Sequence, residues 1–238
     1  MAAQDEATPV PSAPETMRRP SLVLFDVNET LSDMSVMGQR FADVGAPRQL
    51  AVTWFASLLR DGFALTAAGA SASFAELGSG LLGVQLAGLS LDRGLTAAVE
   101  HIMDGFTSLE LHPDVVPGIA ALADLGLRLV TLSNGSASVA AGLFERAGIK
   151  DRFEQLLSVE DAGVWKPAPG SYRYALDRCE VKASETMLVA VHPWDIDGAS
   201  RAGLTTAWLN RTGSPYPGYF RRADVEVEAL GPLAQILT

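Results

Sequence analysis

The sequence is poor in cysteine and in positive charge. Its one cysteine, Cys179, cannot form a disulfide within the chain, so the fold must be held by its packed core. Lysine and arginine total 18 against 28 aspartate and glutamate residues, which gives a net charge of −10. A negative field of this kind repels nucleic-acid phosphates and anionic membranes, so neither is expected as a partner. An anionic ligand would need local cations or amide donors.

Long apolar stretches are also lacking. No run approaches the ~20 apolar residues that a membrane-spanning helix needs. The first twenty residues have no apolar segment of the kind found in secretory signals, so a cytoplasmic location is expected. Residues 1–19 carry three prolines among alanine, glutamate and threonine, a composition that buries too little apolar area to offset the entropy of ordering. We predict a disordered tail there.

Hydrophobic residues make up 48% of the 238 residues, enough to bury a full core. Short apolar runs alternate with amphipathic stretches of helical spacing. We predict five buried parallel strands, at residues 22–25, 129–132, 156–159, 188–191 and 206–209. This alternation predicts an α/β fold with a doubly wound parallel sheet.

The segment after the first predicted strand interrupts the alternation. Residues 33–113 contain no convincing strand, but Leu50, Trp54 and Leu58 have helical spacing. We predict an inserted helical domain over residues 33–113 and a core domain formed by residues 20–32 and 114–238. Within the insertion, residues 78–94 are rich in glycine and leucine without a clear period, so no helix ends are predicted there.

Polar residues directly follow the predicted strands. Ligands of open parallel sheets bind beyond the carboxyl ends of the strands, so these residues are candidates for a functional site. They are Asp26, Ser133, Asn134, Lys166, His192 and Asp195. Taken alone, Asp26 would be interpreted as the cap of the following turn. Beside a hydroxyl, an ammonium and a second carboxylate, it is better interpreted as a nucleophile, in a turn whose N–H groups and Thr30 hydroxyl can surround an anion.

The order of these residues resembles the motifs of the haloacid dehalogenase superfamily. Asp26 is followed four residues later by Thr30, and Ser-Asn-Gly at 133–135, Lys-Pro at 166–167 and an acidic motif at Asp195 follow in turn. The resemblance covers about residues 20 to 211. It implies a hydrolase with a Rossmann-like core, and it matches the inserted helical segment to the superfamily's cap domain, which closes over the active site.

Two positions differ from the metal-dependent phosphatases of that superfamily. Those enzymes carry a second aspartate where this chain has Asn28, and an amide cannot donate and recover a proton in the same way. They also place an extra acid where this chain has Ala190 or Val191. A magnesium site would therefore lack hard oxygen ligands, and neither a metal nor an organic cofactor is expected.

Closer similarity is to the type II 2-haloacid dehalogenases. It rests on the motifs above, on Tyr172 six residues after Lys166, on Trp194 beside Asp195, and on the closing segment 208–213. The resemblance implies that the Asp26 carboxylate displaces halide from C2 of a short 2-haloalkanoic acid. Water then cleaves the resulting aspartyl ester and releases the 2-hydroxy acid.

The resemblance also implies a role for each neighbour of the nucleophile. Lys166 would keep Asp26 ionised, because a nearby ammonium favours the carboxylate form. Asp195 would orient Lys166 and help to activate water. Three residues would donate to the substrate carboxylate, namely Ser133, Asn134 and Thr30. Further candidates for contact with a small anionic substrate are Asn28, Tyr172, His192, Trp194, Arg48 and Arg40.

Two departures from the dehalogenases bear on the mechanism. Their cap arginine, which contacts the departing halide, is Ala46 in this chain, and Arg40 and Arg48 are the candidates to replace it. Their fourth motif has Ser and Asn where this chain has Ala190 and His192. His192 is either a general base for ester hydrolysis or a hydrogen-bonding spacer in place of the amide.

Two other functions stay open on the sequence alone. One is a phosphatase or another small-molecule hydrolase of the same fold. The other is a catalytically weak protein that binds a small anion, which the loss of the cap arginine would allow. A homodimer is compatible with the resemblance, but the sequence does not fix the oligomeric state.

Overall fold

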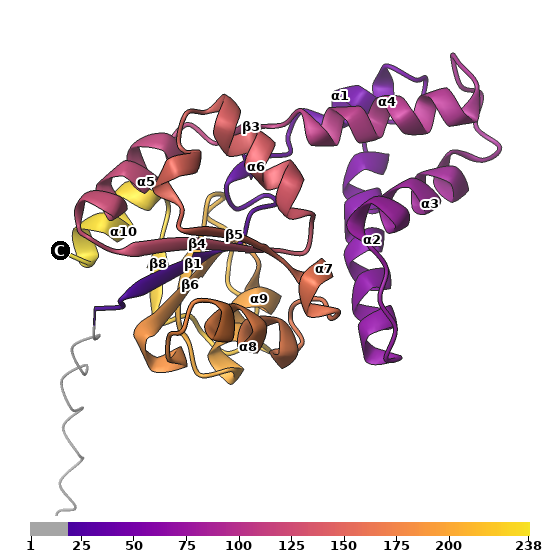
Figure 1. Ribbon diagram of the computed structural model, residues 1–238. Coiled ribbons are helices and arrows are strands. Elements are labelled where there is room, and N and C mark those ends of the chain that lie inside the picture. Colours follow the sequence, from indigo (N-terminus) through magenta and orange to yellow (C-terminus); the bar gives the residue numbers. More distant parts are fainter. Residues whose placement is uncertain (1–18) are drawn as a thin grey trace, which may run out of the picture.

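The computed structural model describes residues 19–238, so the predicted tail lies, apart from Arg19, outside the described residues. Figure 1 shows a sheet with helices on both faces and a further group of helices to one side. The six strands are all parallel, in the order β5-β4-β1-β6-β7-β8. They are β1 (Leu22–Phe25), β4 (Arg128–Ser133), β5 (Gln155–Ser158), β6 (Thr186–Ala190), β7 (Thr205–Leu209) and β8 (Val225–Val227). The predicted α/β fold class is confirmed.

Both faces of the sheet are buried, which explains why its strands appear in the sequence as continuous apolar runs. Along β1, Val23 and Phe25 pack with one set of helices while Leu22 and Leu24 pack on the opposite face. On the first face lie α5 (Val115–Asp124), α6 (Ala137–Arg146) and α10 (Leu230–Ile236), and on the second α8 (Pro169–Arg178) and α9 (Pro193–Arg201). Shorter turns of helix are η1 (Lys150–Arg152), α7 (Val159–Ala162) and η2 (Ala183–Glu185).

Three short strands were not expected from the sequence. One is β8 at the edge of the sheet. The other two form a separate antiparallel pair, β2 (Ser32–Asp33) with β3 (Glu110–Leu111), at the two ends of the segment predicted to hold no strand. Strands of two residues are too short to produce a periodic sequence pattern. The β2–β3 pair brings the two ends of this segment together.

Four helices lie between β2 and β3. They are α1 (Met37–Ala42), α2 (Leu50–Ala67), α3 (Phe74–Leu86) and α4 (Leu95–Thr107). An aromatic cluster joins them: Trp54 of α2 meets Phe74 of α3 edge to face at 6.5 Å between ring centroids, and Phe74 stacks on Phe106 of α4 at 4.5 Å. Ser73 and Glu76 form a capping box that starts α3. The boundaries of the core and cap domains stay a prediction.

Trp165 connects these four helices with the core. Its indole is almost fully buried, its backbone N–H donates to Thr66 Oγ1 at 3.0 Å, and its Nε1 donates to the carbonyl of Ala72 at 3.0 Å. Gly62 of α2 faces the ring so closely that a Cβ there would lie 2.4 Å from Trp165 Cε3. Since Lys166 is the next residue, α2 packs directly against the segment that carries a candidate site residue.

Among the described helices, none combines the length and the apolar character that crossing a membrane requires.

Candidate active site

Asp26 lies at the carboxyl end of the central strand β1. Its backbone N–H donates to the carbonyl of Val189 at 3.0 Å, so it continues the sheet by one residue, and its side chain is buried. The tight turn that follows brings Thr30 back to the carboxylate, and Thr30 Oγ1 donates to Asp26 Oδ2 at 2.6 Å. The backbone N–H of Val191 donates to the same hydroxyl, at 3.1 Å, and this fixes its direction.

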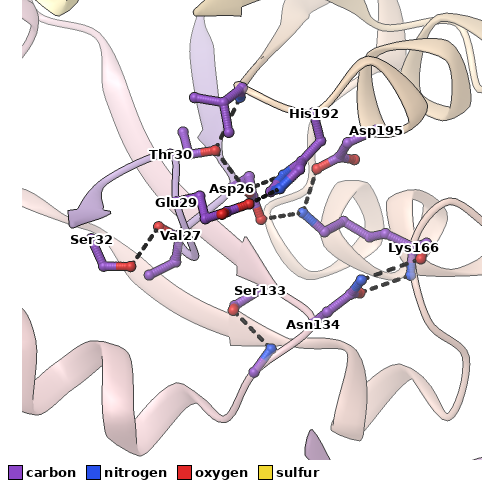
Figure 2. A network of polar contacts seen from close by, with 12 residues as sticks. Asp26, Val27, Glu29, Thr30, Ser32, Ser133, Asn134, Lys166, His192 and Asp195 are labelled. Atoms are coloured by element: carbon purple, nitrogen blue, oxygen red, sulfur yellow. Dashed lines mark hydrogen bonds and ion pairs between the residues drawn. The ribbon is translucent and has the colours of Figure 1, made fainter. Parts of the chain in front are cut away.

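The ammonium of Lys166 lies between two carboxylates (Figure 2). Its Nζ donates to Asp26 Oδ1 at 2.8 Å and to Asp195 Oδ2 at 2.5 Å. Lys166 and Asp195 are fully buried and Asp26 nearly so. Charges that far from water are tolerated only when they are paired and hydrogen-bonded, as they are here.

These contacts shift the pKa values of Asp26 and Asp195 in opposite directions. Burial raises the pKa of Asp26, but the charge of Lys166 and the contacts with His192 outweigh it, so the pKa lies well below its usual range. Burial raises the pKa of Asp195, and the charge of Asp26 adds to this, against the effect of Lys166. Burial lowers the pKa of Lys166, yet its two carboxylate partners raise it above the ordinary value. Asp26 is therefore ionised at neutral pH, as a nucleophile requires.

Ser133 is the last residue of β4 and Asn134 follows it, so both lie at the strand end as expected, but their side chains make different contacts. The Asn134 amide is bound to the backbone of Lys166: its Oδ1 accepts from the Lys166 N–H at 2.9 Å and its Nδ2 donates to the carbonyl at 3.3 Å. Asn134 thus positions the lysine, a contact that the sequence did not indicate. Ser133 Oγ accepts from the N–H of Gly135 at 2.9 Å, which leaves its own hydrogen to donate to a ligand.

Tyr172 also differs from the expectation that it contacts substrate. It is fully buried, and its hydroxyl donates to Asp195 Oδ1 at 2.6 Å. Burial and the neighbouring Asp195 charge raise its pKa well above the ordinary value, so the phenol keeps its proton. Tyr172 therefore holds Asp195, which in turn holds Lys166.

His192 contacts the nucleophile Asp26 on one side and Glu29 on the other. Glu29 is a site residue that the sequence did not single out. His192 Nδ1 lies 3.2 Å from Asp26 Oδ2, and its Nε2 lies 2.9 Å from Glu29 Oε2. Burial lowers the pKa of His192, but the two carboxylates raise it to about 9. The only sequence signal for Glu29 was its place within the nucleophile turn, and its left-handed φ of 61° could not be foreseen.

The faces of the His192 ring are covered by aromatic side chains. Trp194 stacks on it at 4.9 Å between centroids, and Phe55 of α2 lies at 6.4 Å. The Trp194 ring is also 6.0 Å from Lys166 Nζ. Asn28 is buried beside Gly135 and Ser133. Trp194, expected near the substrate, thus lies against the cluster around Asp26, and Asn28 lies beside the loop that follows β4.

A large cavity of about 650 Å³ adjoins this cluster. Glu29 and His192 line it from the core side. On the other side it is lined by Arg48, from the loop before α2, and by apolar side chains of α2 such as Val52 and Phe55. Arg48 also bonds to the Gln39 side chain. Arg40 lies elsewhere: its stem packs against Gly105 and its guanidinium bonds to Ser108 Oγ at 3.4 Å. Only one of the two arginine candidates thus lines the cavity.

The residues around Asp26 do not fit a magnesium ion. The place between Asp26 and Asp195, where a cation could bridge two carboxylates, is taken by Lys166 Nζ. The residue two after the nucleophile is Asn28, and within residues 19–238 no three His, Cys, Asp or Glu side chains gather as a metal site. Hard divalent cations need several oxygen ligands.

Comparison with known proteins agrees with this geometry. The family model of haloacid dehalogenase-like hydrolases matches residues 20–203. The (S)-2-haloacid dehalogenase 1 of Pseudomonas sp. (strain CBS-3) is 29% identical, over 90% of this chain and 95% of that protein. A crystal structure of a dehalogenase with an intermediate complex has a TM-score of 0.85 at 26% identity, covering 92% of this chain and 97% of that one. An L-2-haloacid dehalogenase structure also has a TM-score of 0.85, at 27% identity, covering 92% and 99%.

Proposed function

Because this chain belongs to the haloacid dehalogenase-like hydrolase family, we propose that it hydrolyses a short 2-haloalkanoic acid to the 2-hydroxy acid through an ester of Asp26. The observation that carries the proposal is the buried carboxylate of Asp26, held ionised by Lys166 at 2.8 Å, with Asn28 in place of a second acid. The similarity to proteins named as 2-haloacid dehalogenases over most of the chain supports it.

In the first step the Asp26 carboxylate attacks C2 of the substrate. A C2–O bond forms while the carbon–halogen bond breaks, and the halide leaves with the bonding electron pair. Lys166 balances the negative charges of nucleophile and substrate, and Ser133 donates its free hydrogen to the substrate carboxylate. In the second step water attacks Cγ of Asp26, and the ester oxygen leaves with the 2-hydroxy acid.

We assign the departing halide to Arg48. A halide that gains charge in the transition state needs a donor placed ahead of time. Arg48 lines the cavity that also reaches His192 and Glu29, whereas Arg40 is bound to the far end of α4 at Ser108. The substrate would enter through this cavity. We also propose a cytoplasmic location, and a homodimer stays a prediction.

Two other functions have less support. A phosphatase would need a proton donor at Asn28 and an oxygen-lined cation site, and Lys166 takes the place between the carboxylates. A protein that only binds anions would not need an ionised carboxylate within a paired, buried network. Steady turnover of a 2-haloacid, compared with a generic phosphate ester, separates the three.

The test is a single turnover of 2-chloropropionate in heavy-oxygen water, with enzyme in excess. We expect the label in the Asp26 carboxylate, because water attacks Cγ and the original aspartate oxygen leaves with the product. The Asp26→Asn variant should fold and release no halide, since its amide is nearly the same size but is not a comparable nucleophile. Label found directly in the 2-hydroxy acid would exclude the ester route.

A further inference from the structure

We propose that His192, oriented by Glu29, is the general base for hydrolysis of the Asp26 ester, and that formation of the ester itself converts the imidazole from its acid form to its base form. The inference rests on the proposed function and extends it to the second step. It begins with the cluster in which His192 lies between Asp26 and Glu29, because neither His192 nor Glu29 is used in the first step.

The geometry favours His192 over the other candidate base. A base must lie within hydrogen-bond reach of the proton it removes. His192 Nδ1 is 3.2 Å from Asp26 Oδ2, at the carboxyl group whose carbon the water attacks. Asp195 is fully buried, and both of its oxygens already accept hydrogen bonds, from Lys166 and from Tyr172. Asp195 is thus a positioning residue for Lys166.

Glu29 fixes the direction in which the imidazole accepts a proton. Its carboxylate meets His192 Nε2 at 2.9 Å, which keeps the hydrogen of a neutral ring on Nε2 and turns the Nδ1 lone pair toward Asp26. Glu29 adopts a left-handed φ of 61°, which is rare for a residue with a side chain, and its carbonyl contacts His112 Nε2 at 3.0 Å. The turn at Glu29 is therefore held by two contacts, one from His192 to the side chain and one from His112 to the carbonyl.

In the free enzyme the ring carries a proton on each nitrogen. The charged groups in contact with it are Asp26 and Glu29, while Phe55 and Trp194 cover its faces and Lys166 bonds to the other oxygen of Asp26. Burial lowers the pKa of His192 and these two carboxylates raise it to about 9. As an imidazolium it cannot accept a proton from water.

Esterification changes this balance. The Asp26 ester has no negative charge, so His192 keeps Glu29 as its one carboxylate partner, and the Glu29 side chain is 44% exposed. The pKa of His192 then falls, since an opposite charge favours the protonated ring and that charge has been removed. The proton on Nδ1 leaves through the cavity that His192 and Glu29 line. The neutral ring is produced only when there is an ester to hydrolyse.

The proton movements of the second step balance. As the water oxygen bonds to Cγ, one water proton passes to His192 Nδ1, and the Cγ–O bond to the substrate breaks. The departing alkoxide takes the proton from Nδ1 and becomes the 2-hydroxy acid. The Asp26 carboxyl group then gives its remaining proton to Nδ1, which restores the carboxylate and the imidazolium. One proton is released to solvent per turnover, as hydrolysis of a carbon–halogen bond requires.

The first experiment uses His192→Asn, an amide that keeps a hydrogen bond but cannot act as a base. After rapid mixing with 2-bromopropionate we expect one equivalent of bromide per active site at nearly the wild-type rate. The ester should then accumulate, visible as added mass on the intact protein, because its hydrolysis slows by ~10²-fold or more. Unchanged steady-state turnover without ester, or loss of the bromide burst in a folded variant, would overturn the proposal.

The second experiment tests Glu29 through a pH profile. In the wild type, ester hydrolysis should speed up as pH rises through the pKa of His192 in the ester form. Glu29→Gln removes the last carboxylate partner, so this rising limb should move to lower pH. An unmoved limb contradicts the proposal even if His192→Asn fails to fold. If the wild type releases no bromide at all, the proposed function fails instead.

Discussion

At the nucleophile, one buried ammonium group is shared by two carboxylates, and each member of the group is held by a further contact. Lys166 is positioned by Asn134 through its backbone, and Asp195 by the Tyr172 hydroxyl. Removing one member of a buried ion group leaves an uncompensated charge, which costs about 3–5 kcal/mol. Substitutions of these residues therefore affect folding as well as catalysis, and activity loss alone does not reveal a catalytic role.

The residues at strand ends could be predicted, whereas their partners could not. Asp26, Lys166 and Asp195 follow strands whose carboxyl ends meet at one edge, so sequence order alone placed them together. Glu29 depends on an uncommon backbone conformation, and the contact of Asn134 with Lys166 depends on how two loops approach each other. Such contacts between loops leave no pattern in the sequence.

The two arginine candidates give a matched pair of variants. Arg48→Ala should lower the rate of chloride and bromide release by ~10²-fold, because it removes the proposed donor for the departing halide. Arg40→Ala should stay close to the wild-type rate, since Arg40 packs against Gly105 and lies away from the cavity. Steady-state halide release measures both. If both variants keep the wild-type rate, neither arginine is the halide acceptor.

At the scale of elements, five strands of the sheet were predictable and the edge strand β8 was not. Strands β1, β4, β5, β6 and β7 appear as apolar runs because both faces of the sheet are covered. Strand β8 lies at the edge, has only three residues and places the exposed Glu226 between two valines. An edge strand with one polar position does not form an apolar run.

The helix in the glycine-rich part of the insertion was still harder to predict from the sequence. Residues 78–94 showed no period, yet the first nine of them belong to α3. Gly78 is buried against Trp54 and Met103, and its carbonyl accepts a hydrogen bond from Trp54 Nε1 at 3.0 Å. A glycine on the packed side of a helix replaces the apolar residue that would have marked the period. The helix start at Ser73 and Glu76 was present in the sequence as a capping-box pattern.

Helix α2 supplies a test of how closely the four helices fit the core. In Gly62→Ala the new Cβ would lie 2.4 Å from Trp165, so helix or indole must move. We expect a loss of ~1–3 kcal/mol in unfolding free energy, typical of overpacking, and a lower turnover rate because Lys166 adjoins the displaced tryptophan. Urea unfolding and steady-state halide release measure the two effects.

Gly80→Ala in α3 is the matched control. It is exposed with open space around its Cβ position, and alanine favours a helix over glycine by ~1 kcal/mol. This variant should be slightly more stable and fully active. Equal behaviour of Gly62→Ala and Gly80→Ala would mean that the contact between α2 and Trp165 does not constrain the site.

At the scale of the whole molecule, the net charge of −10 opposes the anionic substrate that the site is proposed to accept. Screening should relieve this repulsion. Raising the ionic strength from ~0.01 to ~0.1 M shortens the Debye length from ~30 to ~10 Å. We expect kcat/KM for 2-chloropropionate to rise and kcat to stay unchanged, because only the approach of the substrate is affected. Sodium sulfate avoids adding the product halide.

The opposite result is equally informative. A fall of kcat/KM with added salt would mean that Arg48 and the other cations near the cavity outweigh the net charge at the distances that govern approach. A change in kcat would mean that salt affects a step after the substrate has bound, and not the encounter of substrate and enzyme.

The small β2–β3 pair has a consequence for how such a protein can change. Through Ser32↔Leu111 and Asp33↔Glu110, the 76 residues between Asp33 and Glu110 enter and leave at one point. A segment anchored in this way can be exchanged for one of another length without rearranging the sheet, because loop length adds little to the cost of closure. The turn with Asp26, Glu29 and Thr30 precedes the junction, whereas Arg48 follows it. Reaction chemistry and substrate selection can therefore be inherited, and recombined, as separate modules.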